Sequence, residues 1–291
     1  MTEPLTIGLV GAGPWARMMT GPILAAGPQT RVTGVWSRTP AHAAELGDQL
    51  QVPVFDDLDA LFDVCEAVSI AVTPQAQPEL AIRAARAGKT LLLEKPLGAE
   101  VDGARSVVDA VNETGVGALV MLTYRFDPAL PAFLAEAARI EPTGGRACFI
   151  SGAFLGGPFA QGWRLERGAV LDIGPHVLDM LEAGMGRIVG VEAAGDPLGW
   201  VSGICTHASG ATSSVAMCCN AATASGRTEI EVYSPRGAAS YDGRAVDHRA
   251  RADQIRRDLV AVAGGAAHPA SVAQALHLQE LIAGIEAQLR T

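Results

Sequence analysis

The chain has 291 residues, of which 49% are hydrophobic and 18% charged, so it can bury the cores of two modest domains. Its formal net charge of −9 argues against a nucleic-acid-binding surface, and no apolar run is long enough to cross a bilayer. The N-terminus carries no basic secretory segment, and the five cysteines show no C-x-x-C spacing and no metal pattern with the histidines. We therefore expect a cytoplasmic protein with reduced thiols and no metal site.

Strand and helix patterns alternate from the N-terminus to about residue 123. Short apolar runs predict buried strands at 5–10, 30–36, 67–72, 90–94 and 117–122. The segments between them predict helices near 14–26, 40–49, 77–87 and 100–113. This alternation is typical of an α/β domain with a doubly wound parallel sheet, which we place at residues 1–123.

The first predicted strand is followed by the loop GAGPWA at 11–16, a G-x-G-x-x-A pattern. Between a strand and a helix, this pattern is the fingerprint of a Rossmann dinucleotide-binding domain. Gly11 permits the tight turn, and Gly13 lets the backbone approach a pyrophosphate. The helix start at Pro14 and Trp15 would then hold the phosphate charge. An ordinary glycine loop is the alternative, but the second predicted strand lies at the distance that a βαβ unit needs.

The end of the second predicted strand carries information on the cofactor. Proteins that select NAD usually place an Asp or Glu there to bind the ribose 2′-hydroxyl, about 20 residues past the glycines. This chain instead has Ser37, Arg38 and Thr39, two hydroxyls and a guanidinium that can hydrogen-bond and neutralise a 2′-phosphate. We therefore expect NADP, with NAD as the second choice, unless the segment is an ordinary turn with a solvated arginine.

A lysine closes the fourth predicted strand, in the tripeptide Glu94-Lys95-Pro96 after three leucines. A buried parallel strand delivers such a side chain to the crevice where ligands of α/β sheets bind. Pro96 favours an extended backbone at Lys95 and makes a cis peptide bond possible. Either Lys95 is a functional amine in that crevice, or Glu94 and Lys95 begin a surface loop.

From Tyr124 onward the pattern changes, and we expect a second domain at 124–291. Strands are predicted at 146–154, 187–194, 198–207, 211–220 and 228–234, with one strong helix among them at 172–184. This pattern is typical of an α+β domain with a largely antiparallel sheet, open on one face. Helices near 249–263 and 271–289 end the chain, and the last could return to pack on the first domain. We interpret the arginines of the first of these helices as a solvated face or a subunit contact: Arg249, Arg251, Arg256 and Arg257.

Asp172 and His176 are four positions apart at the start of the predicted helix 172–184. They can share one helix face, where a carboxylate orients an imidazole for proton transfer and a lysine is delivered from elsewhere. The alternative is a structural role, in which Asp172 caps the helix and His176 is a packed or surface histidine.

Taken in order, these segments resemble the Gfo/Idh/MocA oxidoreductases, the family of glucose-fructose oxidoreductase and inositol dehydrogenase. The resemblance runs along nearly the whole chain and rests on the glycine loop, Thr73-Pro74, Ala87-Gly88-Lys89, Glu94-Lys95-Pro96, Arg125-Phe126, Trp163-Arg164 and Asp172-x-Gly174-x-His176-x-x-Asp179. It implies that Lys95, Asp172 and His176 form the catalytic group. It also implies a cofactor site that includes, beside the glycine loop and residues 37–39, Thr73, Pro74, Glu94, Lys95 and Arg164.

The chain departs from the family patterns in two places. The family often has T-P-N and a following histidine, where this chain has Thr73-Pro74-Gln75 and then Pro78, so we expect different contacts near the nicotinamide. A glycine triplet commonly precedes D-x-G-x-H, but Glu166-Arg167-Gly168 keeps only the last glycine. We expect the two added side chains to occupy space in the substrate pocket and to favour a substrate other than a plain sugar or inositol.

Three functions remain open. The first is hydride transfer between nicotinamide and a hydroxyl or carbonyl of a sugar, cyclitol or similar polyhydroxylated molecule. The others are a ligand-sensing regulator without turnover and a reductase of a bulky unsaturated molecule, as in the related biliverdin reductases. The intact Lys95, Asp172 and His176 favour the first, because the others need no such proton-transfer group. We expect His176 to carry the proton, Asp172 to orient it and Lys95 to bind the reacting oxygen, although His176 and Lys95 can exchange roles.

The sheet of the second domain also predicts assembly. If its open face carries alternating apolar residues such as Val215, Met217 and Cys219, that face is an exposed apolar patch unless another subunit covers it. We therefore expect a homodimer or homotetramer formed through this sheet.

Overall fold

The computed structural model describes residues 3–160 and 162–290, which form two compact units. The first unit ends at Met121 and also contains His248–Leu276, and the second consists of Leu122–Asp247 and the residues from His277 onward. Residues 248–276 therefore join the first unit, whereas the sequence analysis placed residues 124–291 in the second domain, with a last helix that could pack on the first. None of the described helices has the length and hydropathy needed to span a bilayer. A cytoplasmic location stays a prediction.

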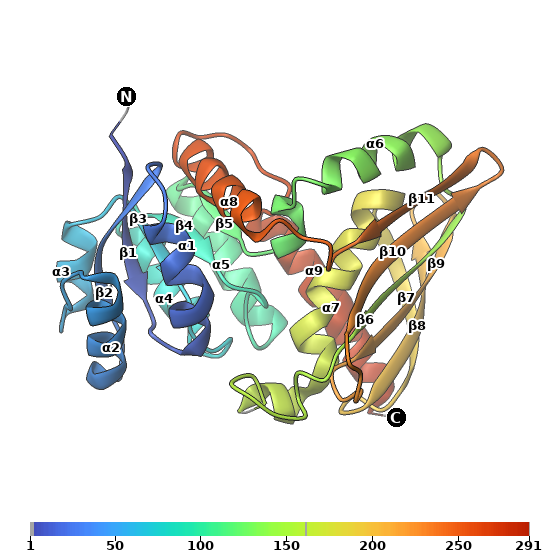
Figure 1. Cartoon of the computed structure of the whole chain (residues 1–291), viewed down its shortest axis with the longest axis horizontal. Helices are drawn as coiled ribbons and strands as arrows, with labels where there is room; N and C mark the ends of the chain where they lie inside the picture. Colours follow the sequence, from blue (N-terminus) through green and yellow to red (C-terminus); the bar gives the residue numbers. More distant parts are fainter. Residues whose placement is uncertain (1–2, 161, 291) are drawn as a thin grey trace. The chain divides into compact units, whose positions relative to one another are not determined.

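The first unit is built on a five-stranded parallel sheet with the order β2-β1-β3-β4-β5 (Figure 1). Its strands are β1 (Leu5–Val10), β2 (Thr30–Trp36), β3 (Ala67–Ile70), β4 (Thr90–Leu93) and β5 (Ala118–Val120). β3 and β4 are buried along their whole length, which explains their continuous apolar sequences. The predicted doubly wound parallel sheet is confirmed.

Helices connect and cover these strands. They are the π-helix η1 (Ala16–Thr20), α1 (Gly21–Ala25), α2 (Pro40–Leu50), α3 (Leu58–Asp63), α4 (Gln77–Arg86), α5 (Val101–Thr114) and α8 (His248–Ala263). The sequence did not predict α3, because its six residues are too few to show a helical period. A local cap stabilises it, since the Asp57 carboxylate accepts a hydrogen bond from Ala60 N at 3.2 Å.

The helix α8 packs on α1, β4 and β5. Its Arg256 is 3% exposed and donates hydrogen bonds to Ile23 O at 2.6 Å and to Gln29 Oε1 at 3.1 Å. The interpretation of this basic stretch as a solvated face or subunit contact is therefore wrong for Arg256, because its guanidinium is held inside the first unit.

The second unit is built on a six-stranded sheet with the order β11-β10-β6-β9-β8-β7. Its strands are β6 (Gly144–Ile150), β7 (Ile188–Gly195), β8 (Trp200–His207), β9 (Thr212–Cys218), β10 (Arg227–Ser234) and β11 (Gly237–Asp242). β6 and β9 are parallel and the other neighbours antiparallel, which confirms the largely antiparallel α+β prediction. The sequence did not predict β11, since most of its residues are small and carry little β-propensity.

The helical elements of this unit are η2 (Thr123–Phe126), α6 (Leu130–Ile140), α7 (Trp163–Met185) and most of α9 (Val272–Leu289). α7 begins nine residues before the predicted start at 172, and its helical geometry is interrupted at Gly168, where φ is 78°. Asp172 lies inside the segment that follows this interruption. The alternative in which Asp172 caps the helix is therefore wrong.

The helix α7 lies along one face of the six-stranded sheet and contacts β6, β8, β9 and β10 (Figure 1). The side chains that this face buries include Val215 at 3% exposure and Met217 at 0%, and Cys219, just past β9, is 1% exposed. The expectation that these apolar residues occupy the uncovered face is wrong, because α7 of the same chain covers their side of the sheet.

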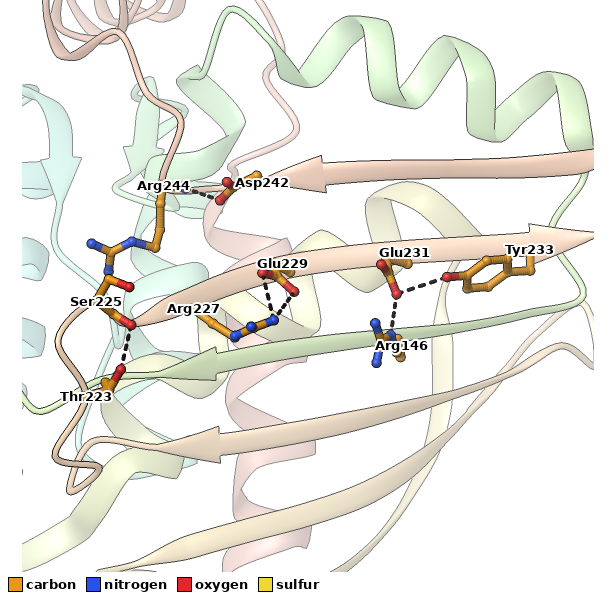
Figure 2. A network of polar contacts seen from close by, with 9 residues as sticks. All are labelled: Arg146, Thr223, Ser225, Arg227, Glu229, Glu231, Tyr233, Asp242 and Arg244. Carbon is orange, nitrogen blue, oxygen red and sulfur yellow. Dashed lines mark hydrogen bonds and ion pairs between the residues drawn. The ribbon is translucent and has the colours of Figure 1, made fainter.

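The opposite face of the sheet carries a mixed row of side chains. The strand register aligns Glu192 with Ile204, Ile204 with Ser214, Ser214 with Arg146, and Arg146 with Glu231. Figure 2 shows Arg146 reaching Glu231, whose carboxylate also accepts a hydrogen bond from Tyr233 Oη at 3.0 Å. A hollow of about 900 Å³ lies over this face.

Candidate active site

The glycine loop has the geometry that a dinucleotide phosphate requires. Gly11 has φ of 102°, and a Cβ there would lie 2.3 Å from Ala71 O, so only glycine fits. At Gly13 a Cβ would meet no atom of the described chain within 4 Å, which leaves the backbone open to a ligand. The helix starts at Pro14 and Trp15, directly after these glycines. This arrangement fits a bound pyrophosphate.

Trp15 links the glycine-loop helix to the segment that follows β4. Its Nε1–H donates to Glu94 Oε1 at 2.6 Å, and the Thr20 hydroxyl donates to the same oxygen at 3.2 Å. Glu94 is 8% exposed, so its carboxylate points inward rather than beginning a surface loop. The structure thus brings together two residues, Trp15 and Glu94, that the sequence placed in one cofactor site.

Lys95 is half-buried and precedes a cis peptide bond to Pro96. The backbone on both sides of it is bound by Gln77, the first residue of α4, which is 1% exposed. Sequence reasoning missed Gln77. A polar residue at a helix start usually indicates a solvated end, and nothing in the local pattern shows that this one is buried.

The predicted cofactor segments of the first unit all follow carboxyl ends of neighbouring parallel strands. The glycine loop follows β1, residues 37–39 follow β2, residues 73–74 follow β3 and residues 94–95 follow β4. This edge of an α/β sheet is where ligands bind. Arg38 and Thr39 are exposed, and Thr39 N donates to Ser37 Oγ at 3.3 Å. Thr73 O accepts from Gln77 N at 3.1 Å, and Pro74 is buried.

In the second unit, Arg164 forms an ion pair with Asp172. Arg164 Nε lies 3.3 Å from Asp172 Oδ2, and both residues belong to α7. The Arg164 guanidinium also lies over the Trp163 ring, 4.6 Å from its centroid, and 5.5 Å from the centroid of Phe159. The structure therefore places Arg164 beside the predicted catalytic carboxylate. Its contact with a cofactor stays a prediction.

His176 lies among aromatic side chains on the buried side of α7. It is 7% exposed, and its ring centroid lies 5.3 Å from that of Tyr124, edge to face, and 6.5 Å from that of Phe149, nearly parallel. These rings limit how the imidazole can turn. Sequence reasoning missed Tyr124 and Phe149, although Tyr124 directly precedes the family motif Arg125-Phe126. Lys95 belongs to the first unit, and Asp172 and His176 belong to the second.

The segment before Asp172 explains which glycine the chain keeps. At Gly168 a Cβ would lie 1.9 Å from Pro197 O, and φ is positive, so this position requires glycine. Arg167 Nη2 lies 2.8 Å from Glu286 Oε2 on α9, and Glu166 is exposed. Arg167 therefore has a partner on α9. The sequence analysis had instead expected its side chain to occupy space in the substrate pocket.

Across residues 3–160 and 162–290, no group of three or more His, Cys, Asp and Glu side chains is placed to hold a metal ion.

Residues 5–122 match the Gfo/Idh/MocA model, described as an oxidoreductase family with an NAD-binding Rossmann fold. The chain is 34% identical over 184 residues to a 1,5-anhydro-D-fructose reductase of Ensifer adhaerens, a match covering 60% of this chain and 54% of the relative. It is 31% identical over 150 residues to a levoglucosan dehydrogenase of Pseudarthrobacter phenanthrenivorans, covering 48% and 37%. These matches span about half or less of the relatives' lengths.

Solved structures share the fold over the whole chain. GenD2 from gentamicin A biosynthesis, in complex with NAD, has a TM-score of 0.86 at 19% identity, covering 100% of this chain and 95% of that one. A levoglucosan dehydrogenase in complex with NADH and L-sorbose has a TM-score of 0.85 at 19% identity, covering 99% and 97%. At these identities the likeness establishes the fold.

Proposed function

We propose that the chain is a nicotinamide-dependent dehydrogenase or reductase of the Gfo/Idh/MocA family, whose model, described as an oxidoreductase family with an NAD-binding Rossmann fold, matches residues 5–122. The proposed substrate is a sugar, cyclitol or similar polyhydroxylated molecule that reacts at a CH–OH or carbonyl carbon. The names of the relatives support this class, since they act on anhydrofructose, levoglucosan, D-apiose and inositol.

The hydrogen bond between Trp15 and Glu94 carries this proposal. It fastens the residue before Lys95 to the helix that follows the glycine loop, within one unit. The phosphate-binding loop and the amine-bearing segment therefore keep a fixed spacing. In the proposed site, Gly11 and Gly13 hold the pyrophosphate of a nicotinamide dinucleotide, which supplies the hydride acceptor or donor.

The chemistry requires two tasks of the protein. Oxidation of an alcohol removes a hydride from carbon and a proton from oxygen, so the site needs a base and a cation that stabilises the developing alkoxide. We assign the proton to His176, with Asp172 orienting the imidazole, and the contact with the reacting oxygen to Lys95. The exchanged assignment, with Lys95 as proton carrier, uses the same residues.

Hydride transfer tests the proposal. Levoglucosan, D-apiose and myo-inositol with the oxidised cofactors, and 1,5-anhydro-D-fructose with the reduced ones, are followed by nicotinamide absorbance. Lys95→Met and His176→Ala should each lose on the order of 10²- to 10⁴-fold in single-turnover rate while still binding cofactor. Near-normal rates in both variants would remove Lys95 and His176 from the mechanism, and an unmodified protein that turns over none of these substrates would favour the ligand-sensing or bulky-substrate functions instead.

We also propose NADP as the preferred cofactor and NAD as the second choice. The exposed Arg38, flanked by the hydroxyls of Ser37 and Thr39 at the end of β2, supports this preference. A 2′-phosphate would gain charge-assisted hydrogen bonds from this set that a 2′-hydroxyl cannot form.

For assembly, we propose a homodimer or homotetramer through the open face of the second-unit sheet. Ile204 and Trp200 on β8 are 57% and 47% exposed, and β9 separates them from the paired charges of Arg146 and Glu231 on β6 and β10. Exposed apolar side chains on a sheet face are suited to burial by another copy. Sedimentation should show Ile204→Glu to be less associated than the unmodified protein. A monomeric unmodified protein would contradict the proposal.

A further inference from the structure

Gln77 makes an unusual set of contacts with the segment that carries Lys95. Its Oε1 accepts a hydrogen bond from Glu94 N at 3.0 Å, and its Nε2 donates to Glu94 O at 2.6 Å. The same Nε2 lies 3.1 Å from Pro96 O and 3.2 Å from Leu97 O, in hydrogen-bonding geometry. One side-chain amide therefore binds the backbone before Lys95 and after it.

These contacts bracket the lysine without touching its amine. Gln77 is 1% exposed, so water cannot readily replace its amide as the donor to these carbonyl oxygens. Loss of the donor would leave the carbonyl oxygens without a hydrogen bond. The neighbouring Pro78, where the family often has histidine, packs toward α5, since a Cβ on Gly103 would lie 3.1 Å from its Cγ. At this start of α4, Gln77 is thus the side chain that reaches the Lys95 segment.

We propose that Gln77 is a positioning residue that sets the direction of the Lys95 amine. The inference rests on the proposed function, in which Lys95 contacts the reacting oxygen. Displacing a reacting group by about 1 Å costs on the order of 10²-fold in rate. A clamp on both flanks of Lys95 limits such displacement, whereas a merely structural Gln77 would affect stability and leave the amine unchanged.

The test uses the fact that Lys89 and Lys95 are the only lysines in the sequence. Trace acetic anhydride labels both ε-amines, and mass spectrometry gives the labelling rate of Lys95 relative to Lys89. Gln77→Met keeps the side-chain length and removes all the hydrogen bonds. It should change this ratio several-fold while Lys89 labelling and cofactor binding stay unchanged. Gln49→Met is the matched control, since Gln49 Nε2 also donates to a backbone carbonyl, Arg17 O at 3.0 Å, on an exposed helix face.

The second readout is the single-turnover rate of hydride transfer, measured with whichever of the four substrates named under the proposed function the unmodified protein turns over. Gln77→Met should lose on the order of 10²-fold in single-turnover rate, and the same change in a Lys95→Met background should cost little more. If Gln77→Met fails to fold, Gln77→Asn keeps a buried amide but shortens the side chain by one methylene, so that it cannot make the same set of contacts. An unchanged labelling ratio in a folded Gln77 variant would overturn the inference, as would additive losses in the double variant. Near-normal turnover in Lys95→Met would instead overturn the role that the proposed function gives to Lys95, while the labelling ratio still reports on the clamp.

Discussion

Arg125 and Asp179 form a buried ion pair with two parallel hydrogen bonds. Arg125 Nε donates to Asp179 Oδ2 at 2.6 Å and Nη2 to Oδ1 at 2.8 Å, and the two side chains are 12% and 3% exposed. Burial opposes the guanidinium charge, but the hydrogen bonds and charge of Asp179 outweigh it, so the pKa of Arg125 is raised. The pair joins η2, which carries Tyr124, to α7 three residues after His176, and so holds Tyr124 beside the imidazole.

Removing one partner of this pair should destabilise the second unit. Asp179→Ala leaves an uncompensated buried guanidinium, and we expect a loss of about 3–5 kcal/mol in the free energy of unfolding. Arg125→Met combined with Asp179→Leu removes both charges and should be more stable than Asp179→Ala alone. Urea unfolding followed by circular dichroism measures these differences.

The exposed pair of Arg83 and Asp59 is the control for this prediction. Their side chains are 47% and 64% exposed, and water screens the interaction, so Arg83→Ala should cost less than about 1 kcal/mol. Similar losses for the buried and the exposed pair would contradict the argument.

Gly168 should tolerate no side chain. Gly168→Ala requires a positive φ and a contact with the Pro197 carbonyl that no rotamer relieves, so we expect a loss of more than about 3 kcal/mol or failure to fold. Glu166→Ala, two residues earlier and exposed, should change stability by less than about 0.5 kcal/mol. Thermal unfolding of the two variants compares them directly, and equal midpoints would show that the backbone adjusts at Gly168.

The elements of the first unit were predictable because their signals are local. The strand at Leu91–Leu93 is buried on both faces and therefore reads as a continuous apolar run, and the glycine loop has a spacing set by its own turn. By contrast, the sequence analysis assigned no helix to α6, although α6 has a proline in its first turn and an apolar face. The segment was interpreted only as the start of the second domain.

The missed parts of the candidate site depend on contacts between distant residues. Trp15 meets Glu94 across 79 positions, and Arg167 meets Glu286 across 119. No periodicity records such a pairing. Gln77 was missed for the same reason, because it is buried against the segment that follows β4, about 20 residues further along the chain. The sequence could name Gly168 as the retained glycine, but only the approach of Pro197 explains why it is needed.

Arg38 should decide between the two cofactors. We expect the unmodified protein to bind NADPH more tightly than NADH, and Arg38→Ala to remove most of that preference, because the guanidinium is the charged partner available to a 2′-phosphate in this segment. Dissociation constants come from nicotinamide fluorescence. The control is Arg31→Ala, an exposed arginine earlier on β2, which should keep the preference. Equal affinities in the unmodified protein would count against NADP.

Cys205 should make the second unit sensitive to alkaline pH. Burial raises the pKa of its thiol to about 11 from an ordinary value of 9.0, an effect that the Ser213 hydroxyl reduces and the charge of Glu182 reinforces. Below pH 9 the thiol is protonated in both folded and unfolded chains and does not affect the balance. Above it, the unfolded chain loses the proton first, so the folded state binds more protons and stability falls as pH rises.

The size of this effect follows from the separation of the two pKa values. A difference of about two units corresponds to a loss on the order of 2–3 kcal/mol between pH 9 and pH 11. In Cys205→Ala this part of the pH dependence should disappear, although the variant starts less stable at pH 8 because it leaves a small cavity where a fully buried side chain stood. Urea unfolding at pH 8 and pH 10.5 separates the two contributions. The cavity in Cys205→Ala lowers the free energy of unfolding equally at both pH values, whereas the thiol of the unmodified protein lowers it only at pH 10.5. If the unmodified protein and Cys205→Ala lost the same stability between these pH values, the alkaline sensitivity would have to arise from other groups.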